Sequence, residues 1–88
     1  MAIREVTVVN QLGLHARPAV LLVKTASQFA CEVKLCKDDM EVNAKSIMGV
    51  LILAAEKGSK VRIVASGADE QQALDALAKL FSEGFGEE

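Results

Sequence analysis

The chain has 88 residues and a mass of 9.4 kDa. A folded protein of that mass exposes about 5,000 Å² of surface, which allows one compact domain, residues 1–88, but leaves too few core side chains to line a deep ligand cavity. Aromatic residues make up only 3% of the sequence and the net charge is −2, so nucleic acid is disfavoured as a partner. These numbers favour chemistry at an exposed surface.

The N-terminal segment predicts a cytoplasmic protein. Charged and apolar residues alternate from Arg4 onward, whereas a signal peptide needs an uninterrupted apolar stretch of roughly 7–15 residues. The longest apolar run, residues 47–55, is far shorter than the ~20 residues of a membrane-spanning helix, so we expect no membrane insertion.

Cys31 and Cys36 are expected on one strand, on opposite faces and about 16 Å apart. A disulfide cannot span that distance, so the sequence predicts two reduced thiols.

The first two elements are predicted to be a strand and a helix. Residues 5–9 are rich in β-branched side chains, and the turn residues of segment 10–13 end that strand. Apolar side chains then recur at helical spacing over residues 16–28. Pro18, the only proline, fits the first turn of that helix because the amide it lacks would have no intrahelical acceptor there.

A hairpin and a second, shorter helix are predicted next. Residues 32–37 alternate with period two, and residues 40–43 can pair back onto them. Ser46 is a good N-cap for a helix over residues 47–55, which Gly58 is expected to end in a left-handed conformation. That helix is apolar nearly all round, which in a small domain indicates that one side is exposed for a partner.

The last third of the chain adds a strand and a third helix. Residues 60–65 alternate again, and Asp69 is expected to cap a helix whose apolar stripe runs to Phe81. The tail, residues 84–88, is expected to fray. The element order β-α-β-β-α-β-α predicts an α+β protein with helices packed on one face of a mostly antiparallel sheet, an open-faced sandwich.

His15 is the one histidine, so any imidazole chemistry depends on it. It is expected at the N-cap of the first helix, where unpaired N–H groups and the positive end of the helix dipole favour an anion. Arg17 opposes that dipole unless an anion is bound beside it. A neutral imidazole nitrogen is a nucleophile that can accept a phosphoryl group. By position alone, capping a helix or decorating a loop is the commoner role for such a histidine.

Three segments resemble one protein family. Residues 13–19, GLHARPA, resemble the phosphohistidine signature of the HPr family, the phosphocarriers of the bacterial phosphoenolpyruvate:sugar phosphotransferase system. Residues 43–50, NAKSIMGV, and 65–70, ASGADE, are similar to the same family, so the resemblance covers essentially the whole chain.

The resemblance implies a four-stranded antiparallel sheet in the order 1-4-2-3 with three helices on one face. It also implies that phosphorylated enzyme I, charged from phosphoenolpyruvate, phosphorylates His15 on Nδ1 and that a histidine of an enzyme IIA then receives the group. Arg17 is expected to help neutralise the phosphoryl group. A carrier must release its group as easily as it binds it, so a shallow site with modest contacts suits the task.

Ser46 has a structural role whether or not it is modified, since a serine N-cap is worth about 1 kcal/mol. The resemblance adds that in many HPr proteins HPr kinase/phosphorylase phosphorylates this serine. A phosphate there brings about −2 of charge beside the docking face, so folding survives while docking weakens. That face is predicted to comprise Ile47, Met48, Leu51 and Ile52, with roughly half of them mainly buried.

Three functions remain open at this point. The leading one is a monomeric phosphocarrier, a substrate of kinases rather than a stand-alone enzyme, without metal or cofactor and with enzyme I, enzyme IIA, the Ser46 kinase and a catabolite-control transcription factor as partners. The second is a regulatory carrier, because residues 80–85 are similar to the nitrogen-related branch of the family. The third is an α/β interaction module, which a His15 ring buried against apolar side chains with both nitrogens bonded would favour.

Overall fold

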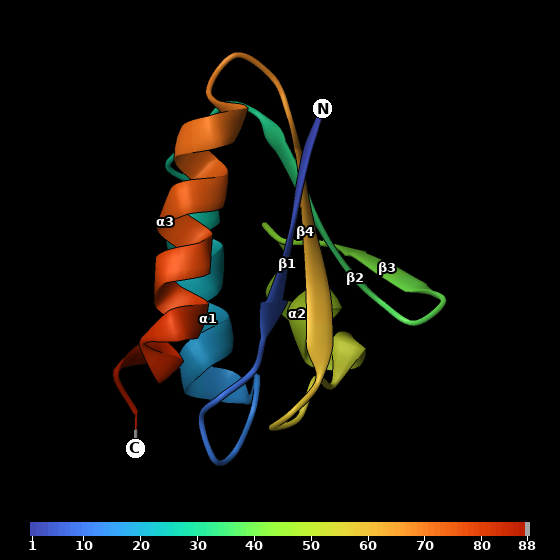
Figure 1. Ribbon diagram of the computed structural model, residues 1–88, viewed down its shortest axis with the longest axis vertical. Coiled ribbons are helices and arrows are strands. Elements are labelled where there is room, and N and C mark those ends of the chain that lie inside the picture. The colour runs from blue at the N-terminus through green and yellow to red at the C-terminus, as the bar shows by residue number, and fades with distance from the viewer. Residues whose placement is uncertain (88) are drawn as a thin grey trace.

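The computed structural model describes residues 1–87 and shows a four-stranded sheet covered on one face by three helices (Figure 1). In chain order the elements are β1 (Ala2–Thr7), α1 (Ala16–Ala26), β2 (Glu32–Lys37), β3 (Met40–Asn43), α2 (Ile47–Leu53), β4 (Lys60–Ser66), α3 (Glu70–Ser82) and the short 3-10 helix η1 (Gly84–Gly86). The strands lie in the order β1-β4-β2-β3 and every pairing is antiparallel. The predicted open-faced sandwich is confirmed, and its surface of 4878 Å² is close to that expected for the mass.

The central strand β4 shows why the sheet has one covered face. Val61, Ile63 and Ala65 are each 0% exposed beneath the helices, whereas the residues between them, such as Arg62, face outward. In β2 the same alternation buries Val33 and Leu35, and Leu35 pairs with Ile63 in register. Strand period two therefore places one side chain in two in the core.

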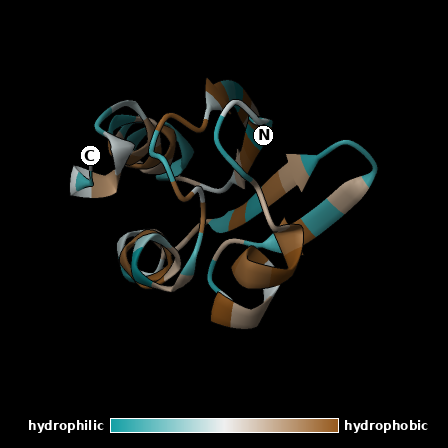
Figure 2. Ribbon diagram, turned by 90° about the horizontal axis from the view of Figure 1, so that it is seen from below, coloured by the Kyte–Doolittle hydropathy of each residue, from teal (hydrophilic) through white to brown (hydrophobic). Residues whose placement is uncertain are grey.

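Helices α1 and α3 bury one stripe each against that face. The fully buried helical residues recur at helical spacing and are Ala19, Leu22, Ala26, Ala73, Leu74, Leu77 and Phe81. Helix α2 is hydrophobic over almost all of its length and lies below the sheet beside α1 (Figure 2). Over residues 1–87, none of these helices has the length and hydropathy to cross a bilayer.

Several element ends differ from the sequence prediction, most clearly in β1 and α2. β1 covers Ala2–Thr7, not residues 5–9, because its ladder with β4 runs from Ala2 opposite Ala65 to Thr7 opposite Lys60. The β-branched run suggested a later strand, but the pairing partner sets the register. α2 ends at Leu53, and Ala54 takes the left-handed conformation (φ 52°) that was expected of Gly58.

Asp69 precedes α3 but makes no side-chain cap bond to it, so the prediction that it caps this helix is wrong. Its carboxylate accepts hydrogen bonds from the backbone N–H groups of Ala30 (2.8 Å) and Cys31 (3.0 Å) and so ties the loop before β2 to the start of α3. These bonds, Ala30's foremost, hold the pKa of Asp69 below its ordinary value. Cys31 lies just ahead of β2, and both it and Cys36 are buried free thiols.

The tail is ordered where it was expected to fray. Gly84 to Gly86 forms η1, and Phe85 is 6% exposed with its ring centroid 4.9 Å from that of Phe81 in an edge-to-face arrangement. Residue 88 lies outside the described part of the chain. Because the ring of Phe85 packs on Phe81, Glu87 lies beside the N-terminal end of α1, where the candidate site is found.

Candidate functional site

His15 occupies the N-cap of α1 as predicted. Its backbone is extended (φ −85°, ψ −166°) and its carbonyl accepts the first helical bond from the N–H of Ala19 at 2.9 Å. Its imidazole makes no capping bond to the helix, and the side chain is 36% exposed. A buried ring with both nitrogens bonded would have favoured a non-catalytic module, and the structure shows a half-exposed ring instead.

The loop before His15 is held rigidly. Gly13 has φ 68°, and a Cβ at that position would collide with the carbonyl oxygen of Ala55, so the turn requires glycine. The next residue, Leu14, donates its N–H to that same carbonyl at 2.8 Å. Asn10, 1% exposed, closes the loop from inside by donating from Nδ2 to the carbonyl of Gly13 at 2.8 Å. The histidine is therefore presented on a fixed support.

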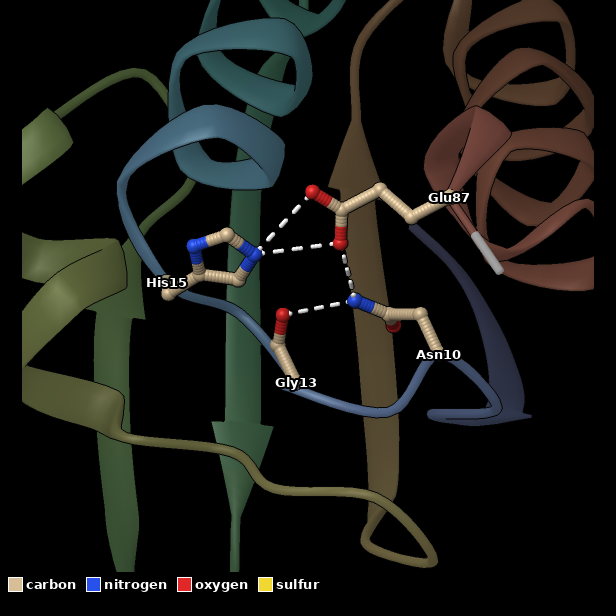
Figure 3. A network of polar contacts seen from close by, with 4 residues as sticks. All are labelled: Asn10, Gly13, His15 and Glu87. Atoms are coloured by element: carbon tan, nitrogen blue, oxygen red, sulfur yellow. Dashed lines mark hydrogen bonds and ion pairs between the residues drawn. The ribbon is translucent and has the colours of Figure 1, made fainter.

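Glu87 contacts the histidine directly (Figure 3). Both of its carboxylate oxygens lie 3.0 Å from Nε2 of His15, and one of them also accepts from Nδ2 of Asn10 at 3.0 Å. The hydrogen bond from His15 is the largest cause of the lowered pKa of Glu87, and the charge of Arg17 adds to it. Sequence reasoning missed Glu87 and Asn10, because no motif links residues 72 or 77 positions apart.

Arg17 lies in the first turn of α1 with its side chain exposed. No salt bridge to its guanidinium forms within residues 1–87, although its charge reaches Glu87. It lines one end of an open groove along α1, whose other walls are formed by Ala16, Val20, Leu21, Lys24 and Phe85. The end of α1 thus combines exposed backbone donors, a cation and a half-exposed imidazole, which together suit an anion.

Ser46 begins the second helix in the expected way. Its Oγ accepts the N–H of Gly49 at 3.1 Å, which is N-cap geometry. The four predicted docking residues are all exposed, at 42% for Ile47, 66% for Met48, 37% for Leu51 and 58% for Ile52. The expectation that half of them would be mainly buried is wrong, because Val50 and Leu53 alone form the buried side of α2.

No metal centre emerges from the part of the chain that the structure describes. Residues 1–87 contain no group of three or more His, Cys, Asp or Glu side chains placed to bind one ion.

The chain is similar in sequence and in structure to known proteins of one family. The family model described as "PTS HPr component phosphorylation site" matches residues 3–83. The phosphocarrier protein HPr of Treponema pallidum is 48% identical over 88 residues and all of both chains. A solved HPr of Thermoanaerobacter tengcongensis is 45% identical and superimposes with a TM-score of 0.96 over 100% of this chain and 99% of that one.

A second kind of relative is described as a catabolite repression protein. The HPr-like protein Crh of Bacillus subtilis is 47% identical over 94% of this chain and 98% of its own. A crystal structure of Crh, the catabolite repression protein, covers 94% of this chain with a TM-score of 0.77 and is described as a domain-swapped dimer. The relatives of this sequence thus include both phosphocarriers and a regulatory protein of the same fold. The chain belongs to the HPr family, the phosphocarriers of the phosphotransferase system.

Proposed function

We propose that His15 is the residue that carries the phosphoryl group, which it takes from phosphorylated enzyme I and passes to a histidine of an enzyme IIA. The observation that carries this proposal is the half-exposed imidazole at the N-terminus of α1, next to Arg17 and within the GLHARPA run. An exposed ring can meet a donor and an acceptor in turn, whereas a buried ring cannot.

Nδ1 is the ring nitrogen that reacts. Nε2 faces Glu87, whereas Nδ1 lies on the side of the ring away from that carboxylate (Figure 3). In the transfer, the lone pair of Nδ1 forms a bond to phosphorus while the bond from phosphorus to its donor atom in enzyme I breaks and the electron pair of that bond returns to the donor. The reverse exchange with an enzyme IIA histidine discharges the carrier.

Arg17 and the first turn of α1 stabilise the added charge. The backbone N–H groups of Ala16 and Arg17 have no acceptor within the helix, and Pro18 has no N–H to offer. An anion near these donors and the guanidinium is stabilised, and the conflict between Arg17 and the helix dipole disappears. Because these contacts are exposed, they do not trap the group.

The exposed side of α2, comprising Ile47, Met48, Leu51 and Ile52, is the docking face for enzyme I and enzyme IIA. Phosphorylation of Ser46 by an HPr kinase/phosphorylase places charge at the edge of this face and weakens docking. A catabolite-control transcription factor is the further partner of the phosphoserine form. The carrier acts in the cytoplasm and as a monomer, which leaves the docking face free for successive partners.

A purely regulatory carrier is the second candidate, and the likeness to Crh favours it. Both candidates use His15 or Ser46 as a phosphorylated site, and they differ in the acceptor. Rapid transfer from the purified carrier to a sugar-specific enzyme IIA supports the transport role, whereas transfer to regulatory acceptors alone supports the other. A non-covalent interaction module is the least favoured reading, because the His15 ring is not enclosed.

The deciding experiment is phosphorylation with enzyme I and phosphoenolpyruvate. The wild-type chain is expected to gain an acid-labile, base-stable phosphate, and His15→Ala is expected to gain none. Ser46→Ala serves as the control, because it removes the other candidate site and should be labelled like the wild type. Label that persists in His15→Ala contradicts the proposal.

A further inference from the structure

We propose that Glu87 is a positioning residue for phosphoryl transfer, which keeps a proton on Nε2 of His15 and stabilises the ring while Nδ1 carries the phosphoryl group. This inference rests on the proposed function of His15 and deepens it. A carboxylate can only accept hydrogen bonds, so the proton in the contact between Nε2 and Glu87 belongs to the imidazole. The lone pair of the neutral ring then lies on Nδ1.

The carboxylate is held in place from two sides. Phe85, buried against Phe81, fixes the chain two residues before Glu87. Asn10 donates from Nδ2 to the carboxylate and to the carbonyl of Gly13, and its own Oδ1 is buried without a partner within residues 1–87. Turning that amide over would set its oxygen against two other oxygens, so its orientation is fixed. The same loop that presents His15 therefore also holds its partner.

The charge of the ring changes during the cycle. When Nδ1 forms its bond to phosphorus, Nε2 still carries a proton, and the ring becomes an imidazolium with one positive charge. A carboxylate with both oxygens 3.0 Å from Nε2 stabilises that charged ring more than it stabilises the neutral one. When phosphorus leaves, the electron pair of the bond returns to Nδ1 and the ring is neutral again. The proton on Nε2 stays throughout, so neither transfer requires proton exchange with water.

The charges around Glu87 support this role. Its pKa is lowered by the hydrogen bond from His15, by the Asn10 amide and by the charge of Arg17, so the side chain is a carboxylate at neutral pH. Arg17 lies near both the carboxylate and the expected phosphoryl position, and so it moderates the repulsion between these two anions. The site thus pairs one fixed anion with the ring and leaves the cation for the transferred group.

The experiment separates the hydrogen bond from the charge. In Glu87→Gln the amide oxygen can still accept from Nε2 but carries no charge, whereas Glu87→Ala removes both. Glu83→Gln is the matched control, because Glu83 is an exposed acidic residue of the same segment. For each chain, the protonated ring nitrogen of His15 is identified by ¹⁵N NMR at neutral pH, and the equilibrium of phosphoryl exchange with enzyme I is measured. The backbone signal of Phe85 reports whether η1 is still packed.

In the wild type the proton is expected on Nε2, and Glu87→Gln should keep it there. Both Glu87 variants should shift the exchange equilibrium away from the carrier by roughly three- to tenfold, the range between an exposed ion pair and a charge-assisted hydrogen bond. Glu87→Ala should also show a population protonated on Nδ1, and Glu83→Gln should match the wild type. An unshifted equilibrium in Glu87→Gln, or a wild-type proton on Nδ1, overturns the inference. If the wild-type chain is not phosphorylated on His15 at all, the proposed function fails instead.

Discussion

The N-terminal ends of α1 and α2 are built from the same backbone geometry and completed in opposite ways. Each N-cap residue is extended and its carbonyl accepts the first helical bond, from Ala19 to His15 at 2.9 Å and from Val50 to Ser46 at 3.0 Å. Ser46 then also caps its helix with its side chain, through Gly49, whereas the ring of His15 turns away toward Glu87. At the start of α2 a side chain of the protein accepts a free backbone N–H, whereas at the start of α1 no side chain does, so the N–H groups there are left for a ligand.

This difference shows how chemistry is separated from stability in a small domain. A serine cap stabilises α2 and is useful before any modification occurs. The histidine at α1 contributes no such bond, and Arg17 in the first turn opposes the helix dipole. A position that is locally unfavourable for folding is the one that suits a charged ligand, and this is the physical reason for assigning the phosphoryl group to the α1 end.

The largest effect is expected from removing the cation at the open end. Arg17→Ala takes away the exposed guanidinium that we propose stabilises the phosphoryl group, so transfer from enzyme I should slow by roughly 100-fold, the lower end of what losing one preorganised donor costs. The free energy of unfolding should not fall, because Arg17 forms no salt bridge within residues 1–87. Rapid-quench phosphotransfer and chemical denaturation measure the two quantities. Lys24→Ala is the control cation on the same helix, and an equal loss there contradicts a specific role for Arg17.

A charge placed at Ser46, at the start of α2, should slow phosphoryl transfer less than the loss of Arg17 does. Ser46→Asp keeps a good N-cap, so the fold should be retained, but it places an anion beside the proposed docking face on α2. Transfer from enzyme I is expected to slow by roughly tenfold, mainly through weaker docking. Ser46→Asn keeps the cap without the charge and should transfer like the wild type. Equal rates for the Asp and Asn variants would show that Ser46 does not border the docking face.

The same two helix ends show what the sequence could predict. The N-caps at His15 and Ser46 follow from local signals, namely a glycine loop, a proline in the first turn and a serine before an apolar run. The strand order and the site motif follow from a resemblance that covers the whole chain. Both kinds of information lie in neighbouring residues or in matched motifs, which is why the sequence alone predicts them.

The contacts that were missed join distant parts of the chain. Glu87 reaches His15 because Phe85 packs on Phe81, and Asp69 caps the loop at Ala30 and not its own helix. A carboxylate accepts hydrogen bonds from the donors that the fold brings near it. The prediction that residues 84–88 fray rests only on their position at a terminus. Tertiary contacts of this kind leave no periodic trace in the sequence.

Replacing the two N-cap residues, Ser46 and His15, should lower the free energy of unfolding by modestly different amounts. Ser46→Ala removes the bond to Gly49 and should lower the free energy of unfolding by about 1 kcal/mol. His15→Ala removes no cap bond, so it should lower the free energy of unfolding by less, even though it is expected to prevent phosphorylation. Urea denaturation of the two variants under the same conditions makes the comparison. A larger loss for His15→Ala would mean that its contact with Glu87 holds the fold together and is not confined to the site.

The smallest effect is expected from pH, acting on the one side-chain contact that the structure gives the His15 ring within residues 1–87. The pKa of Glu87 is depressed in the folded chain, so the stabilisation that its carboxylate provides is complete above the ordinary value of 4.5 and is lost as the pH falls through the lower, folded value. Protonation weakens the bonds from His15 and Asn10, and residues 84–87 should then loosen while the sheet remains folded. NMR signals of Phe85 should report this loosening at a pH where those of Ile63, at the centre of the sheet, do not change. In Glu87→Gln the acid-dependent step should vanish, because the amide that replaces the carboxylate does not titrate; a step that persists there would assign the loosening to another carboxylate.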